Sequence, residues 1–196
     1  MPRSIHFWRG RLPHWEVEDG RYFVTIHLAG EIPREASDRI HAMASSVNSR
    51  DPEAGLRIQR LIFREMERWL DGAAKLRYLE NPRIAAMVRE AIVFRIKGRI
   101  WEVFEYVLMP NHVHLFLEIA EGSLKTSIAD FKRWTAGRAA EILGIEGDRF
   151  WQREWFDHWS RSAEEDDKIT RYIRENPVNA GLVRRYVDWP YGSWAQ

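Results

Sequence analysis

Two histidines separated by one residue, His112 and His114, are the side chains in this sequence best suited to chemistry. Residues 112–119 predict a strand, and strand side chains alternate between faces, so we expect both imidazoles on one face, roughly 7 Å apart. Because the chain has no cysteine, a shared metal would take its other ligands from oxygen or amide groups, which suits Mg²⁺ or Mn²⁺ acting on a phosphate. The alternative is a pair of half-buried strand histidines with hydrogen-bonded rings.

A second candidate group lies on a helix predicted to begin after Ser162. Tyr172 and Asn176 are one helical turn apart, so their side chains can address the same point. A tyrosine hydroxyl can act as a covalent nucleophile when a base or a metal activates it, and the flanking Arg171 and Arg174 can contact phosphates. The alternative, which the spacing alone favours, is an ordinary aromatic residue at the edge of a packing face.

Several further polar residues are weaker candidates. Lys132 and Arg133 lie on a helix predicted over residues 123–143 and can follow DNA phosphates, although a solvated helix face explains them equally simply. His158 fits a packing role as well as a catalytic one. His27, on the first predicted strand, is expected to be structural.

The elements that position these residues follow from hydrophobic periodicity and turn residues. Strands are predicted at 21–28, 100–109 and 112–119, with a fourth inside 150–161. Helices are predicted at 56–70, 82–97, 123–143 and from Ser162 to about Glu175, where Asn176-Pro177 closes the last one. Residues 1–20 and 31–55 show no clean pattern.

This order predicts an α+β fold: a ferredoxin-like or RRM-like βαββαβ antiparallel sheet with packed helices. An additional C-terminal helix carries Tyr172. A length of 196 residues fits one domain over residues 1–196.

Composition narrows the class of protein. With 30 Lys and Arg against 29 Asp and Glu, the net charge is +1, so a basic surface for nucleic acid has to be gathered by the fold. Without cysteine, disulfides and zinc-thiolate sites are excluded. No apolar run approaches the ~18 residues of a membrane span, and the N-terminus lacks the apolar core of a signal peptide, which predicts a cytoplasmic protein.

Three separated segments resemble one known family. Residues 106–117, Tyr-Val-Leu-Met-Pro-Asn-His-Val-His-Leu-Phe-Leu, are similar to the His-hydrophobic-His segment of single-tyrosine (HUH) transposases. Residues 150–158 and 172–183 resemble the branch called REP-associated tyrosine transposases, relatives of the smallest insertion-sequence transposases. The resemblance runs from about residue 20 to residue 194. Residues 31–80 match less well, which indicates a helical insertion around them.

The resemblance implies a metal-dependent endonuclease and strand transferase that acts on single-stranded DNA next to hairpins like those of repetitive extragenic palindromes. Tyr172 would attack the scissile phosphate, leaving a 5′-phosphotyrosine and a free 3′-OH. His112 and His114 would hold Mg²⁺ or Mn²⁺, and Asn176 would take the place of the third protein ligand. Both a monomer and a homodimer are compatible with it.

Two alternative functions stay open. A domesticated relative could recognise a DNA or RNA hairpin without transposing. A metal-dependent phosphodiesterase could use water in place of tyrosine, and it would cut DNA without forming a protein–DNA adduct.

Overall fold

The centre of the protein is a four-stranded antiparallel sheet with the order β4-β5-β3-β6. The computed structural model describes residues 4–47, 51–70, 75–144 and 150–195. The strands are β3 (Arg21–His27), β4 (Trp101–Leu108), β5 (His112–Ile119) and β6 (Phe156–Trp159). All four were expected from the sequence, and the mixed fold with an antiparallel sheet and packed helices is confirmed.

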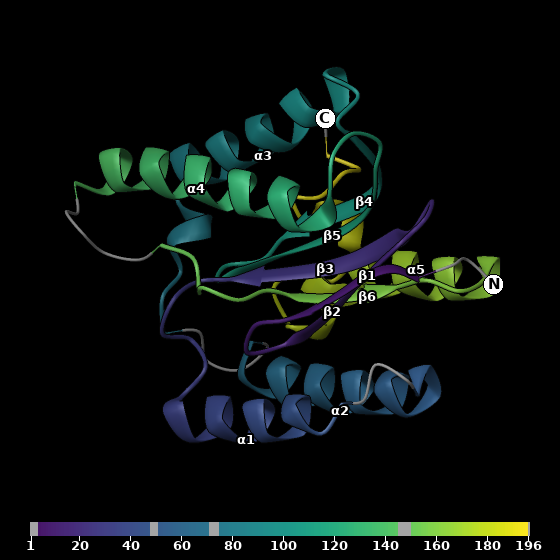
Figure 1. Cartoon of the computed structure of the whole chain (residues 1–196). Coiled ribbons are helices and arrows are strands. Elements are labelled where there is room, and N and C mark those ends of the chain that lie inside the picture. The colour runs from purple at the N-terminus through teal and green to yellow at the C-terminus, as the bar shows by residue number, and fades with distance from the viewer. Residues whose placement is uncertain (1–3, 48–50, 71–74, 145–149, 196) are drawn as a thin grey trace.

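Two helices, α3 (Pro82–Lys97) and α4 (Leu124–Leu143), cover one face of the sheet (Figure 1). Val113 and Leu115 of β5 point into this layer, and neither has exposed surface. Because α3 follows β3 and α4 follows β5, the layer completes the predicted βαββαβ arrangement.

The opposite face carries α1 (Arg34–Ser45), α2 (Pro52–Leu70) and α5 (Ala163–Asn179). Phe23 and Phe116 pack there against helix residues that form a second hydrophobic core. The sequence pattern did not indicate α1, because few of its twelve residues are apolar: only Ala36, Ile40 and Ala44 are buried. The alternate side chains of each strand therefore enter two different cores.

Residues 31–80 contain α1, α2 and the short 3-10 helix η1 (Tyr78–Glu80). Positions 48–50 and 71–74 of this segment lie outside the described residues. That the segment is an insertion, and that the chain is one domain, stay predictions.

The prediction that α5 closes at Asn176-Pro177 is wrong, because the helix continues to Asn179. Its end is a Schellman motif: Leu182 N–H donates to Pro177 C=O at 2.9 Å, and Gly181 adopts φ +69°. Asn176 and Pro177 are both buried, so packing outweighs the extended preference of a residue before proline. The continued helix keeps Tyr172 and Asn176 one turn apart.

A hairpin of β1 (Ser4–Arg9) and β2 (Pro13–Val17) precedes the sheet and contacts β6 through β2. The sequence did not predict it, since its apolar and polar residues do not alternate regularly. The chain ends in a second 3-10 helix, η2 (Tyr186–Asp188), and a tail in which Trp189 Nε1 donates to Leu108 C=O at 2.8 Å. Among the described residues, no helix is long and apolar enough to cross a membrane.

His14 of β2, Asp157 of β6 and Glu154 form a charged cluster that holds the hairpin. Because His14 titrates, we expect the stability of the protein to depend on pH. Burial alone would lower the pKa of His14, but hydrogen bonds and charge from Asp157 and Glu154 raise it to about 9. The cluster therefore makes its full contribution to the free energy of unfolding below pH ~6.5. This contribution is lost as the pH rises from ~6.5 to about 9. A shift of this size corresponds to on the order of 3 kcal/mol.

Urea unfolding of the wild type and of His14→Gln at pH 6 and pH 9 checks this prediction. We expect the stability difference between the two proteins to shrink at the higher pH. His41→Gln, at an exposed histidine of α1, is the control and should keep a constant difference. A His14→Gln deficit that is equal at both pH values contradicts the prediction.

Candidate active site

The register of β5 between β3 and β4 places His112 and His114 on one face of the sheet, among the helices α1, α2 and α5. His27 and Thr25 of β3 lie opposite them. Both imidazoles are buried, and their Nε2 atoms lie 3.0 Å apart. The expectation that the two rings share a face is met, and they lie closer together than strand spacing alone indicated.

Hydrogen bonds at the opposite edges of the two rings fix their orientation. Asn111 Nδ2 donates to Glu31 Oε2 at 2.9 Å and to Leu70 C=O at 3.1 Å, so its Oδ1 faces His112 Nδ1 at 2.6 Å. An amide oxygen only accepts, and His112 therefore carries its hydrogen on Nδ1 and a lone pair on Nε2. His114 Nδ1 lies 2.9 Å from Thr25 Oγ1, a contact that leaves its Nε2 facing the same point.

Burial keeps both rings neutral. Desolvation lowers the pKa of His114 to about 3. The pKa of His112 also falls well below its usual value, because of burial and then of unfavourable charge interactions with His114 and His27. A neutral imidazole with a free Nε2 lone pair is the form that binds metals.

Tyr172 of α5 comes within reach of the histidines in the same chain. Its hydroxyl lies 3.4 Å from His114 Nε2 and accepts a hydrogen bond from Asn176 Nδ2 at 3.1 Å. Asn176 Oδ1 is buried and has no hydrogen-bond partner among the described residues. The Asn176 side chain nevertheless lies near enough to His112 to oppose the burial effect on its pKa.

These donors fit a divalent ion. Two ligand atoms ~2.1 Å from an octahedral ion and at a right angle lie ~3.0 Å apart, which equals the separation of the two Nε2 atoms. The orphaned oxygen of Asn176 supplies a third donor beside them. Within the described part of the chain, no group of three or more His, Cys, Asp and Glu side chains is arranged to hold a metal.

Glu67 of α2 is a site residue that sequence reasoning missed. It accepts a hydrogen bond from the Tyr172 hydroxyl, and its Oε1 lies 3.9 Å from His114 Nε2. Its side chain is 14% exposed. The amphipathic pattern of α2 predicted a packed helix, and the only signal for Glu67 is its position one turn after Phe63, on the face that meets α5.

The candidate DNA-binding residues of α5 differ in their surroundings. Arg171 is exposed. Arg174 Nε lies 2.5 Å from a carboxylate oxygen of Glu105, a residue that is 1% exposed on β4. Arg171 is therefore the freer of the two to meet a phosphate.

Lys132 and Arg133 lie on α4, across the sheet from Tyr172. The ammonium of Lys132 donates to Arg153 C=O at 2.6 Å, and burial lowers its pKa to about 8. Arg133 is exposed and paired with Asp130 at 2.7 Å. The structure does not bring either residue to the Tyr172 side.

Two further candidate histidines, His27 and His158, lie near the site without joining it. His27 is buried, with Nδ1 3.0 Å from Leu28 C=O, and burial lowers its pKa to about 4. His158 of β6 holds Glu165 of α5 at 2.9 Å. Ser162 Oγ accepts from the Glu165 N–H as a helix cap, and Glu165 Oε2 accepts from the N–H of Arg161.

Comparisons with known proteins agree on one family. The family described as "Transposase IS200 like" matches residues 74–176. A REP-associated tyrosine transposase of Escherichia coli (strain K12) is 28% identical over 109 residues, which cover 55% of this chain and 63% of the relative. The chain thus matches less than two thirds of the length of that relative.

A solved structure has the same fold. It is a REP-associated tyrosine transposase bound to a REP hairpin, with a TM-score of 0.58 at 19% identity. The match covers 92% of this chain and 80% of the other. The resemblance seen in the three sequence segments is therefore confirmed.

The buried amide of Asn111 predicts a measurable loss of stability. Asn111→Ala leaves the Glu31 carboxylate and the Leu70 carbonyl without this donor, and we expect the free energy of unfolding to fall by about 1–3 kcal/mol. Urea unfolding measures the change. Asn179→Ala, at an exposed position near the end of α5, is the control, and equal losses in the two variants contradict the prediction.

Proposed function

The chain belongs to the IS200-like transposase family, and from this premise we propose that it is a metal-dependent endonuclease and strand transferase for single-stranded DNA. It acts next to hairpins through a covalent 5′-phosphotyrosine on Tyr172. The names of the relative and of the structural neighbour, which is bound to a REP hairpin, support hairpins like those of repetitive extragenic palindromes as the substrate.

One observation carries the proposal. The Tyr172 hydroxyl, the Nε2 atoms of His112 and His114 and the amide of Asn176 converge from β5 and α5 on one point of a single chain. A lone packing tyrosine would not need a buried polar group on three sides of its hydroxyl. A nucleophile needs such groups to orient and activate it.

The cleavage step follows from these contacts. Tyr172 Oη forms a bond to the scissile phosphorus while the bond from phosphorus to the 3′ oxygen breaks. The phenolic proton passes to the Glu67 carboxylate, which already accepts a hydrogen bond from this hydroxyl. The departing 3′ oxygen takes up a proton from solvent water and becomes the free 3′-OH. Attack by a 3′-OH on the phosphotyrosine reverses every step and rejoins DNA without ATP.

His112, His114 and Asn176 are the residues that would hold Mg²⁺ or Mn²⁺. When bound, such an ion neutralises charge that develops on the phosphate oxygens in the transition state. The hydrogen bond that His112 Nδ1 donates to Asn111 Oδ1 holds the His112 ring so that its Nε2 lone pair faces the site. In this proposal Asn176 has two tasks, since its Oδ1 would be a ligand of the ion and its Nδ2 orients the Tyr172 hydroxyl.

The DNA strand would meet α5 first. Arg171 is placed to contact phosphates beside Tyr172, with Arg174 as a second contact if it leaves Glu105. Lys132 and Arg133 would contact only DNA that crosses the opposite face of the sheet.

Replacing the nucleophile tests the proposal. We expect Tyr172→Phe to lose formation of a denaturation-resistant adduct completely, while affinity for the hairpin stays within a few-fold, because only the attacking oxygen is removed. The assay uses labelled single-stranded hairpins from repeats that flank the gene, with Mg²⁺ or Mn²⁺, and mass spectrometry to map the attachment. Tyr78→Phe, at a half-buried tyrosine of η1, is the control.

Other outcomes identify the competing functions. Tight hairpin binding by the wild type without any adduct or cleavage favours a domesticated binding protein. Cleavage without an adduct favours attack by water. An adduct mapped to a residue other than Tyr172 would refute the assignment of the nucleophile.

The role of Glu67 is tested by an isosteric change. Glu67→Gln keeps the volume of the side chain and removes its capacity to accept a proton, and we expect adduct formation in a single turnover to slow by about 10²–10³-fold. Glu65→Gln is the matched control, because its side chain is also 14% exposed on α2 but pairs with Arg39. Rates within twofold of wild type for both variants would exclude proton transfer to Glu67.

A further inference from the structure

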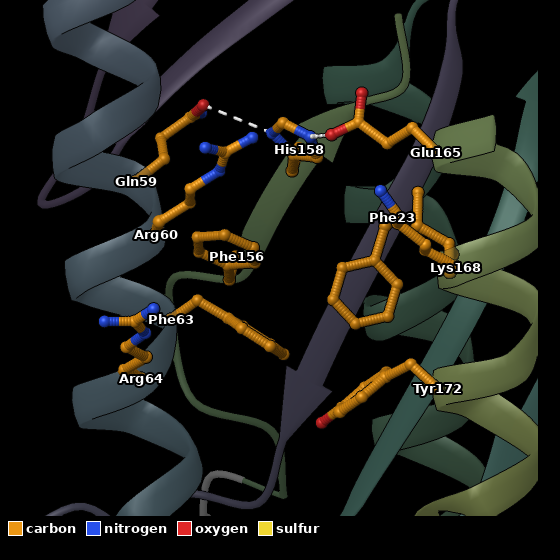
Figure 2. Close-up of a pocket in the computed structure, with 11 residues that line it drawn as sticks. Phe23, Gln59, Arg60, Phe63, Arg64, Phe156, His158, Glu165, Lys168 and Tyr172 are labelled. Atoms are coloured by element: carbon orange, nitrogen blue, oxygen red, sulfur yellow. Dashed lines mark hydrogen bonds and ion pairs between the residues drawn. The ribbon is translucent and has the colours of Figure 1, made fainter. Parts of the chain in front are cut away.

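A cavity of about 300 Å³ opens between α2 and α5, and Tyr172 forms part of its wall (Figure 2). Figure 2 shows the Tyr172 ring at one end of the cavity and His158 and Glu165 at the other. The proposed metal-binding groups do not account for this space, because His112, His114 and Asn176 do not line it. Its volume is at the small end of ligand pockets, which suits a single flat group and excludes a hairpin stem.

The inner wall of the cavity is aromatic. Phe63 of α2 lies 5.1 Å from Phe156 and 5.2 Å from Phe23, measured between ring centroids. Phe23 and Phe156 are 5% and 4% exposed and form the floor, whereas Phe63 is only half-buried. A half-buried phenylalanine beside an open space offers a ring face on which a flat apolar surface can stack.

The rim of the cavity is basic. Arg60 and Arg64 follow each other at one-turn spacing on α2, and Lys168 faces them from α5 (Figure 2). Both arginines are exposed, and neither forms an ion pair within the part of the chain that the structure describes. Lys168 pairs with Glu164, at 2.7 Å on the surface of the same helix. An anionic chain that crosses the rim would find three cations around an aromatic floor.

Polar groups at the far end can contact the edge of a ring. Gln59 is 2% exposed, its Oε1 makes only a long contact of 3.5 Å with His158 Nδ1, and its Nε2 donates one hydrogen bond, to Asp157 C=O. A glutamine amide has further donor and acceptor capacity, which is the pair of functions that reads a nucleobase edge.

We infer that this cavity binds one unpaired nucleobase, that of a nucleotide adjoining the scissile phosphate. Aromatic stacking surrounded by cations is how proteins hold single-stranded bases, and bases drawn out of a stack are bound between apolar walls with polar groups at their edges. The inference rests on the proposed function. It adds a substrate subsite, built by α2 together with β3, β6 and α5, in which the identity or presence of one base controls cleavage.

The position of the subsite follows from helix geometry. The Tyr172 ring forms one end of the cavity. Lys168 lies one turn of α5 before Tyr172, and Phe63 lies one turn of α2 before Glu67, so these two lining residues are ~5 Å along their helices from the proposed catalytic groups. A distance of this size fits a nucleotide next to the scissile phosphate and is too short for a nucleotide several positions away. The base in the cavity would hold its phosphate next to Tyr172.

A combined scan of DNA and protein tests the subsite. Hairpins are made with an abasic nucleotide at each position around the cleavage site, and affinity is measured in EDTA, where cleavage does not interfere. For the wild type we expect one adjoining position at which removal of the base weakens binding roughly 5- to 150-fold. Phe63→Ala should weaken binding of the intact hairpin by a similar factor. The affinity of this variant should then be unchanged when the base at that position is removed.

Matched variants distinguish the effect of aromatic stacking on hairpin binding from the effects of misfolding and of lost positive charge. Phe63→Leu keeps apolar volume in the cavity and is expected to show the same loss of sensitivity if the alanine variant does not fold. Phe94→Ala, at an exposed phenylalanine on the other side of the sheet, should keep the wild-type abasic profile. Arg60→Gln and Arg64→Gln should each lower the salt dependence of log K by up to ~0.7, and Arg68→Gln should not.

Two results would overturn the inference. One is a wild type that tolerates abasic nucleotides at every position next to the cleavage site. The other is a Phe63 variant that keeps the full wild-type penalty. Adduct formation by the wild type on the intact hairpin, measured in parallel with Mg²⁺, reports on the proposed function itself. If the adduct forms while one of these two results is obtained, only the proposed base subsite is refuted. If the wild type neither forms the adduct nor binds the hairpin, the subsite and the proposed function are both refuted.

Discussion

Two imidazole nitrogen atoms lie 3.0 Å apart in the middle of the sheet, and the rest of the site depends on how they are held. Burial removes water from both rings and keeps them neutral. Asn111 fixes the hydrogen of His112 on the side away from its neighbour, which turns a lone pair toward the shared point. His114 Nε2 lies opposite this lone pair, and the other ring nitrogen of His114 contacts Thr25 Oγ1. The two ring nitrogens thus address one buried point between β5 and α5.

The face that carries the histidines has to be covered, and the helices that cover it also bring the reactive groups. α5 packs through Ile169 and Ile173, and the same helix presents Tyr172 and Asn176. α2 packs through Ile62 and Met66 and presents Glu67. Because each helix is anchored by apolar residues one or two positions from its reactive group, packing of the core sets the reactive distances. This coupling also explains why α5 extends beyond Pro177, since an earlier end would release the Asn176 amide.

The reactive point and the aromatic cavity share Tyr172 and are electrostatically different. Around the hydroxyl lie neutral imidazoles and a carboxylate, which suit proton transfer and metal binding. Around the cavity lie Arg60, Arg64 and Lys168, which suit the phosphates of a strand. The chain has almost no net charge, so in the proposed function it is this local gathering of cations by α2 and α5 that would hold the strand. Chemistry and strand binding are thus separated along the length of two helices.

Local patterns in the sequence determined the four sheet strands, the shared face of His112 and His114 and the one-turn spacing of Tyr172 and Asn176. Each of these features depends on a spacing of two residues in a strand or about four in a helix, which can be seen within one short segment of the sequence. Three motifs in a fixed order were also enough to identify the family. Only the tertiary structure decided that Glu67 reaches Tyr172, that Glu31 and Asn111 set the tautomer of His112, and that a cavity lies beside Tyr172. These contacts join residues as far apart as the 105 positions between Glu67 and Tyr172. No local period connects such residues, because their meeting is set by how two amphipathic helices pack across one sheet.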